Sequence, residues 1–186
     1  MERVMIFIDG SNFYFSLKSF NNMEINVKKV NFLKLGKKLC VENRKSIRIY
    51  YYNAPLNKQE YNEKYIKQQR FFEKLRKTPE LNLVLCRLQK RWLNKNKTKY
   101  EYAIKGDDIH IAVDTVKLAY NDAYDTAILV SGDGDFAPAI EAVQEKGKRA
   151  EQAYFKKGPF WHLKQKCNES IFIDENFTKN CFDNVQ

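Results

Sequence analysis

The stretch that most constrains the fold is Asp125–Phe136, which reads Asp-Thr-Ala-Ile-Leu-Val-Ser-Gly-Asp-Gly-Asp-Phe. Its apolar run Ala127–Val130 does not alternate with polar residues, which is typical of a strand covered on both faces in a parallel sheet. A glycine-containing turn with two carboxylates, Asp133 and Asp135, follows directly. Ligands of open α/β sheets bind where parallel strands end. This segment therefore predicts an acidic site at the carboxyl edge of a sheet.

A second apolar run near the start of the chain ends in the same way. Val4–Ile8 leads into Asp9, and a helix is predicted to follow, with Ser11 or Asn12 as its cap. If both strands lie in one sheet and point the same way, Asp9 joins the two acids of the later turn.

The composition is that of one globular domain over residues 1–186, because 44% of the residues are hydrophobic. Predicted strands alternate with helices, which indicates an α/β fold with a mostly parallel sheet. The pattern runs through residues 3–155, and a helix–strand–helix extension is predicted over residues 156–186. No apolar run approaches the ~20 residues of a membrane span, and a strand predicted at the very start leaves no room for a signal peptide. Four widely spaced cysteines favour free thiols and a cytoplasmic location.

The chain is basic, with 33 Lys and Arg against 23 Asp and Glu. This charge suggests an anionic partner such as nucleic acid, although solubility needs also favour lysine. Basic and aromatic residues are interleaved in Gln89–Lys105, which is predicted to form a β-hairpin turning near Asn94–Asn96. The residues predicted to contact nucleic acid are Lys90, Arg91, Trp92, Lys95, Lys97 and Lys99. A solvated hairpin whose Trp92 packs on the protein body is the alternative.

A third acidic position lies at the start of a predicted helix that runs to about Tyr120. Asp107 and Asp108 occupy its first turn, where acids are often only partners of the helix dipole. The predicted core stripe consists of Ile109, Val113, Val116 and Tyr120. This stripe would turn Asp108 toward the sheet and Asp107 away from it. Asp114, further along the helix, is expected to support the site.

Carboxylates that meet in this way repel one another unless a cation neutralises them. Oxygen ligands without Cys or His favour Mg²⁺ or Mn²⁺ over zinc. A basic surface around such a site fits metal-assisted hydrolysis of phosphodiesters.

Three other interpretations remain open. Gly132–Ala137 matches the G-x-G-x-x-A turn of dinucleotide-binding domains, but its two acids would repel a pyrophosphate. A phosphatase with Asp9 as nucleophile would need a second acid two residues later, where Ser11 stands. An enzyme acting on small nucleotides or phosphates is the third.

Three segments together resemble the motifs of LabA-like NYN domains in the PIN-like nuclease superfamily. They are Phe7–Asn12, Lys105–Asp108 with Asp114, and Leu129–Phe136. The resemblance implies a three-layer Rossmann-like sandwich with a central, mostly parallel sheet, a divalent-metal site and ribonuclease activity. The catalytic and metal-binding residues that it implies are Asp9, Asp108, Asp133 and Asp135. The supporting residues are Asn12, Asp107, Asp114 and Ser131.

We therefore expect an Mg²⁺- or Mn²⁺-dependent ribonuclease that cuts single-stranded or structured RNA internally. A non-catalytic RNA-binding or regulatory module with the same fold is the alternative. The family commonly has an apolar residue where Asp107 stands, so the choice between Asp107 and Asp108 as metal ligand stays open. The sequence is also compatible with a homodimer.

Overall fold

A computed structural model describes residues 1–20, 27–156 and 160–182. Six parallel strands form one sheet in the order β3-β2-β1-β6-β7-β8. They are β1 (Glu2–Asp9), β2 (Arg44–Asn53), β3 (Leu81–Leu85), β6 (Thr126–Val130), β7 (Arg149–Tyr154) and β8 (Glu169–Phe172). The chain builds one half of the sheet outward from β1 and the other outward from β6. The strand order therefore reverses between β1 and β6, where α/β sheets bind their ligands.

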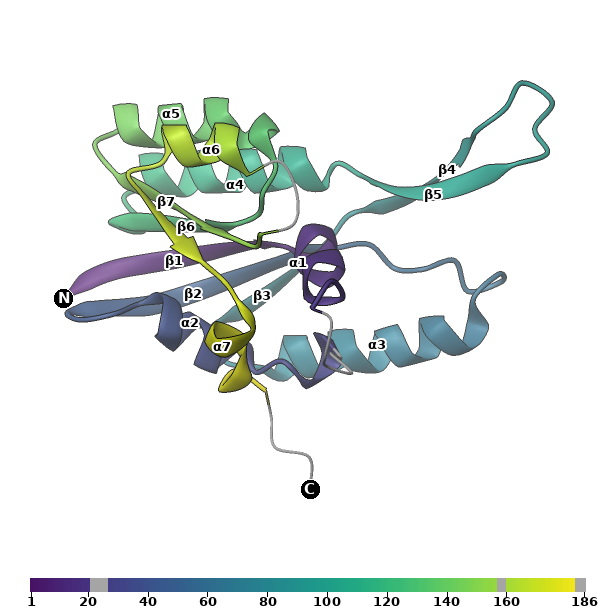
Figure 1. The fold of residues 1–186 in the computed structure, drawn as a ribbon, viewed down its shortest axis with the longest axis horizontal. Helices are drawn as coiled ribbons and strands as arrows, with labels where there is room; N and C mark the ends of the chain where they lie inside the picture. Colours follow the sequence, from purple (N-terminus) through teal and green to yellow (C-terminus); the bar gives the residue numbers. More distant parts are fainter. Residues whose placement is uncertain (21–26, 157–159, 183–186) are drawn as a thin grey trace.

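Helices cover both faces of the sheet, which confirms the predicted three-layer Rossmann-like, PIN-like sandwich (Figure 1). On one face lie α1 (Gly10–Leu17), η1 (Val27–Lys29), α2 (Phe32–Leu39), α3 (Asn62–Lys77) and α7 (Glu175–Lys179). On the other lie α4 (Asp107–Tyr120), α5 (Ala137–Glu145) and α6 (Trp161–Lys166), and a short turn of helix, η2 (Gly134–Phe136), precedes α5. Side chains of β1 alternate between the two cores, with Ile6 and Ile8 in one and Met5 and Phe7 in the other.

The predicted hairpin is present as β4 (Arg87–Trp92) and β5 (Tyr100–Lys105), an antiparallel pair that projects from the body between β3 and α4 (Figure 1). The Asn94 side chain stabilises the connecting turn by accepting hydrogen bonds from the backbone N–H groups of Thr98 and Lys99. We call residues 87–105 the arm.

The C-terminal extension has the predicted helix–strand–helix order and is part of the sheet. Its strand β8 pairs with β7, and the backbone N–H of Asn31 donates to the carbonyl of Cys181 at 2.7 Å. Residues 157–159 and 183–186 of this predicted extension lie outside the described residues. Over the part of the chain that is described, no helix is long and apolar enough to cross a membrane. All the cysteines lie in that part and are free thiols.

Candidate active site

Asp9 is a buried carboxylate at the end of β1, with 7% of its surface exposed. One oxygen, Oδ1, caps α1 by accepting the backbone N–H of Asn12 at 2.9 Å. The expectation that Ser11 or Asn12 caps this helix is therefore wrong, and Asn12 contributes its N–H instead. Burial raises the pKa of Asp9, and the hydrogen bonds from Asn12 and Ser131 oppose that rise.

A chain of hydrogen bonds connects Asp9 to the turn that follows β6. The Ser131 hydroxyl donates to Asp9 Oδ2 at 3.1 Å and accepts the backbone N–H of Asp133 at 3.2 Å. Asp133 Oδ1 in turn accepts the backbone N–H of Asp135 at 3.0 Å. Parallel pairing of Ile8 with Val130 brings these two strand ends side by side. The structure thus brings Asp9, Ser131, Asp133 and Asp135 together at the reversal point of the sheet.

Helix α4 packs on a different face from the one that the sequence predicted. Its buried residues are Ile111, Thr115 and Ala119, whereas the predicted core residues Ile109, Val113 and Tyr120 are exposed. The Thr115 hydroxyl donates to the carbonyl of Ile111, so a polar residue is satisfied within the core. Residues four apart share a helix face. Asp107 therefore lies on the side of Ile111 and is half-buried, while Asp108 lies beside it and is more exposed.

The acids of α4 act electrostatically on those of the strand ends. Partial burial, followed by the charges of Asp107, Asp9, Asp133 and Asp135, raises the pKa of Asp108 to about 6. The charge of Asp107 also raises the pKa of Asp9. The carboxylates therefore share one region, and we call Asp9, Asp107, Asp108, Asp133 and Asp135 the acidic cluster.

Asp114 lies outside this cluster and connects α4 to β2. The hydroxyl of Tyr52, a buried residue at the end of β2, donates to Asp114 Oδ2 at 3.0 Å. Burial raises the pKa of Tyr52, and the Asp114 charge adds to the rise. Asp114 thus anchors α4 beside the strand ends.

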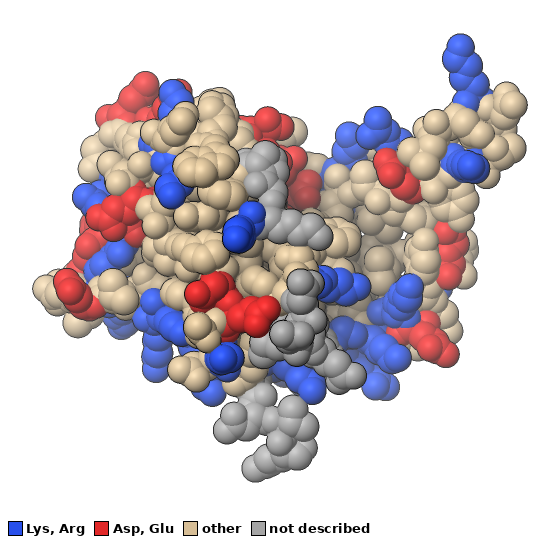
Figure 2. Space-filling view, viewed as in Figure 1, with Lys and Arg blue, Asp and Glu red and all other residues tan. Residues whose placement is uncertain are grey.

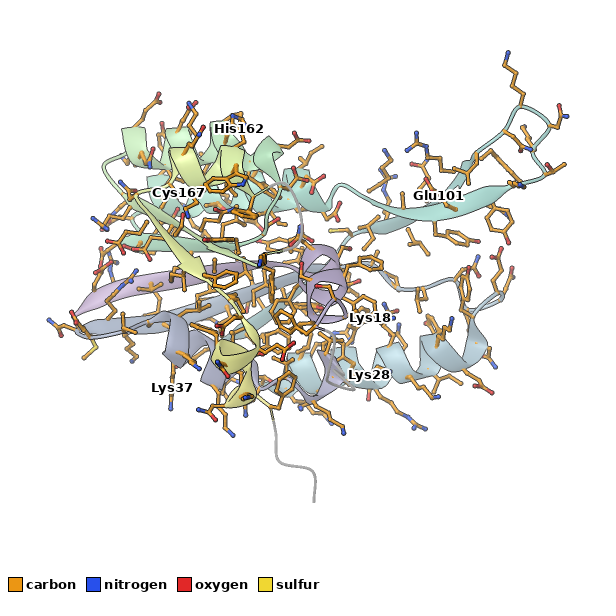
Figure 3. The ribbon with its side chains drawn as sticks, viewed as in Figure 1. Lys18, Lys28, Lys37, Glu101, His162 and Cys167 are labelled. Atoms are coloured by element: carbon orange, nitrogen blue, oxygen red, sulfur yellow. The ribbon has the colours of Figure 1, made fainter. Side chains whose placement is uncertain are left out.

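Helix α6 covers the acidic turn, which the sequence did not indicate. A Cβ added to Gly134 would lie 2.9 Å from Nδ1 of His162, so glycine is needed here for close approach. Figure 3 shows His162 on the α6 side of the sheet. Phe160 lies against Gly132 and stacks on the exposed ring of Trp161 at 5.1 Å. The one sequence signal was the aromatic pair Phe160–Trp161, which belongs to no motif.

The arm does not carry its basic residues to the acidic cluster, because it projects away from the body (Figure 1). Lys90 Nζ lies 3.5 Å from the ring centre of Tyr100 and 3.6 Å from Glu60 Oε1, and Arg91 lies 4.0 Å from Glu101. Trp92 is 42% exposed and packs edge-on against Tyr100. Lys95, Lys97 and Lys99 are exposed near the tip.

The donor atoms of the acidic cluster fit a hard divalent cation, since they are all carboxylate oxygens. Within the described residues, however, no group of three or more His, Cys, Asp or Glu side chains is placed to hold a metal ion. The neighbouring acids act electrostatically on Asp9 and Asp108, whose pKa values they raise after burial.

Comparison with known proteins identifies the family. Among solved structures, a protein of unknown function from Vibrio parahaemolyticus has a similar fold, with a TM-score of 0.65, 22% identity and 95% of each chain covered. MurG from Acinetobacter baumannii is more distant, with a TM-score of 0.43, 11% identity, and 95% of this chain and 43% of that chain covered, and carries no functional argument. No curated protein matches the sequence significantly. The family model of the NYN domain matches residues 3–174, and the chain therefore belongs to the NYN domain family.

Proposed function

We propose that this chain is a divalent-metal-dependent ribonuclease of the LabA-like NYN type, which cuts RNA internally at the acidic cluster. NYN domains are generally nucleases of the PIN-like superfamily, so membership supports a nuclease role. The observation that carries the proposal is the hydrogen-bond chain from Asp9 through Ser131 to Asp133 and Asp135. It fixes acids from two separate strands at the reversal point of the sheet, where α/β enzymes bind ligands.

Each residue has a defined part in the proposal. Asp9, Asp107 and Asp133 would hold the cation, with Asp108 and Asp135 beside them. Mg²⁺ or Mn²⁺ supplies positive charge that offsets the carboxylates and the charge developing on the scissile phosphate. Ser131 orients Asp9 by donating to Oδ2. Asp114 accepts from Tyr52 and so keeps the first turn of α4 in place.

The direct test compares wild-type protein with Asp133→Asn on a labelled RNA in Mn²⁺, Mg²⁺ or EDTA. We expect cleavage in the metal ions and none in EDTA. The variant should lose on the order of 100-fold or more in cleavage rate with RNA binding retained, as expected when one charged group at a reaction centre is removed. Glu73→Gln, an exposed acid on α3, is the matched control and should cut normally. Metal-dependent cleavage that survives in Asp133→Asn would contradict the proposal, and sequencing the products of total RNA would identify the sites cut.

One observation favours a second candidate, a non-catalytic RNA-binding or regulatory module. Within the described residues, no side chains are grouped as a formed metal site. This module would bind RNA without cutting it, and Mn²⁺ would not raise its melting temperature. Turnover of mononucleotides without retention of RNA would instead indicate a small-molecule enzyme.

A further inference from the structure

A groove of about 850 Å³ lies between the arm and the body of the protein. Helix α3 forms one side, and the arm residues Leu88 and Glu101–Ile104 form the other. Its inner end is lined by Gly10 and Ser11, which directly follow Asp9. The groove therefore extends from the base of the arm to the residues that directly follow Asp9.

Electrostatic coupling supports this continuity. Tyr51, which lines the groove, is 1% exposed. Burial raises the pKa of Tyr51, and the negative charge of Asp9 adds to the rise. The inner end of the groove and the Asp9 carboxylate are thus within electrostatic range of each other.

Three lysines give the α3 side of the groove a positive charge. Lys64 and Lys67 are exposed on α3, and Lys28 lies at the inner end of that helix (Figure 3). Burial lowers the pKa of Lys28, and the charge of Lys67 lowers it further. Like charges held this close favour an anion between them. Figure 2 shows Lys and Arg gathered on the arm and around α3, with fewer acids among them.

Aromatic rings line the same groove. Tyr14 and Phe15 project from α1, and Phe15 is 68% exposed. Tyr61 lies at the start of α3 and meets Tyr102 of the arm edge-on, with 6.0 Å between ring centres. Phe15 is exposed and the three tyrosines are half-buried. Accessible rings beside lysines are the surface on which unpaired bases stack while their phosphates are neutralised.

The outer end of the groove is closed by contacts between the arm and the segment before α3. Glu60 accepts hydrogen bonds from the hydroxyls of Tyr100 and Tyr102 at 2.9 and 2.7 Å. Asn57 Nδ2 donates to the Tyr102 hydroxyl at 2.9 Å. The arm thus roofs the groove and restricts what can lie in it.

We infer that this groove holds a single strand of nucleic acid and guides it to the acidic cluster, which makes unpaired RNA the substrate class of the proposed nuclease. The inference rests on the proposed function, because it takes the acidic cluster as the place where the bound strand is cut. The groove has the volume of a site for one drug-sized ligand. That volume suits a few unpaired nucleotides.

The test measures binding in EDTA, where metal-dependent cleavage does not interfere. A fluorescein-labelled 12-nucleotide oligouridine is titrated with wild-type protein and with Lys64→Ala/Lys67→Ala. We expect the double variant to bind about tenfold more weakly and to show a flatter dependence of affinity on salt, by about 1.4 units of slope, because two phosphate contacts are lost. Lys34→Ala/Lys37→Ala is the matched control. Both lysines are exposed on α2 and neither lines the groove, and Figure 3 shows Lys37 there. This variant should bind like wild type.

Two further comparisons separate a single-strand groove from a general basic surface. Tyr61→Ala should weaken oligouridine binding roughly tenfold while Tyr61→Phe binds normally, because stacking needs the ring and not the hydroxyl. A 12-base-pair RNA duplex should bind at least tenfold more weakly than the single strand. Equal affinity for the duplex, or equal losses in the α3 and α2 lysine variants, would overturn the inference.

These results are distinguishable from failure of the proposed function. If wild-type protein binds oligouridine through the groove but cuts no RNA in Mn²⁺, the proposed nuclease activity is wrong and the inferred binding groove is supported. If Lys64→Ala/Lys67→Ala cuts RNA as fast as wild type, the nuclease proposal is supported and the inference about the groove is wrong.

Discussion

The acidic cluster and the groove are neighbouring regions of opposite charge that are built in different ways. Asp9 and Ser131 are buried, and hydrogen bonds join them to the ends of two central strands. The groove is closed by exposed contacts between Glu60 and two tyrosines on a projecting hairpin. The proposed catalytic acids are thus held by the core. The surface proposed to bind a strand is held by contacts that water can reach. The two regions meet at Gly10, which follows Asp9 and lines the groove.

The largest expected effect distinguishes the two acids of α4. Asp107→Asn should reduce cleavage by about 1,000-fold, or about 4 kcal/mol of activation free energy, because Asp107 is half-buried on the side of Ile111. Asp108→Asn should lose less, since this side chain is exposed. Single-turnover cleavage rates in saturating Mn²⁺ measure both. A larger loss for Asp108→Asn would restore the order that the sequence suggested.

The junction of the two regions should tolerate no side chain at Gly10. A Cβ there would lie 2.3 Å from the backbone carbonyl oxygen of Tyr52. We expect Gly10→Ala to lower the free energy of unfolding by about 3 kcal/mol through overpacking. Gly132→Ala is the control, because its Cβ would meet no atom closer than 3.8 Å. Urea denaturation of both variants gives the comparison, and equal stability would contradict it.

Partial burial of Asp108 and repulsion within the acidic cluster should appear as a pH effect on the metal-free protein. Because the pKa of Asp108 is raised from 3.8 to about 6, the folded state binds more protons than the unfolded state between these values, and stability falls as pH rises through them. Asp108→Asn should therefore raise the melting temperature at pH 7.5 and leave it unchanged at pH 3.5. Solvent screening keeps the gain to about 1 kcal/mol or less, or roughly 2–4 °C.

Asp125 provides the control of opposite sign. Hydrogen bonds from Arg3 lower the pKa of Asp125 to about 2, so this carboxylate stabilises the fold above about pH 4 and loses that effect as pH falls toward 2. Asp125→Asn should lower the melting temperature at pH 7.5. The same sign for both variants would mean that the acids of the cluster do not repel one another.

The smallest effect is expected at the outer end of the groove. Tyr102→Phe removes the hydroxyl that contacts Glu60 and Asn57 but keeps the ring. Oligouridine affinity should fall about threefold, as for the loss of a modest hydrogen bond, and amide hydrogen exchange in the arm should become faster. Unchanged exchange would show that these contacts do not hold the arm in place.

The sequence was most informative where the hydrophobic pattern of a segment directly reflects its burial in the fold. Val4–Ile8 and Ala127–Val130 are uniformly apolar because both faces of each strand are covered, so the acids at their ends could be assigned to one edge of the sheet. The face of α4 could not be predicted. Its apolar residues surround the helix, and Thr115 is buried through a hydrogen bond that no pattern reveals.

The groove could not be predicted for a different reason. Its lining comes from segments between Gly10 and Ile104 that are distant in the sequence. The basic residues of Gln89–Lys105 predicted nucleic-acid contacts toward the tip of the arm, whereas the groove lies at its base. Contacts such as Tyr61 with Tyr102 depend on how the hairpin docks, which periodicity does not specify.

The position of β8 has a consequence for the order in which the molecule is made. This strand completes the edge of the sheet beside β7, and the carbonyl of Cys181 receives the N–H of Asn31 just before α2. Synthesis proceeds from the N-terminus, so these contacts form only after the segments from β1 to α6 have been made. Until β8 has been made, β7 has no strand paired to its outer side.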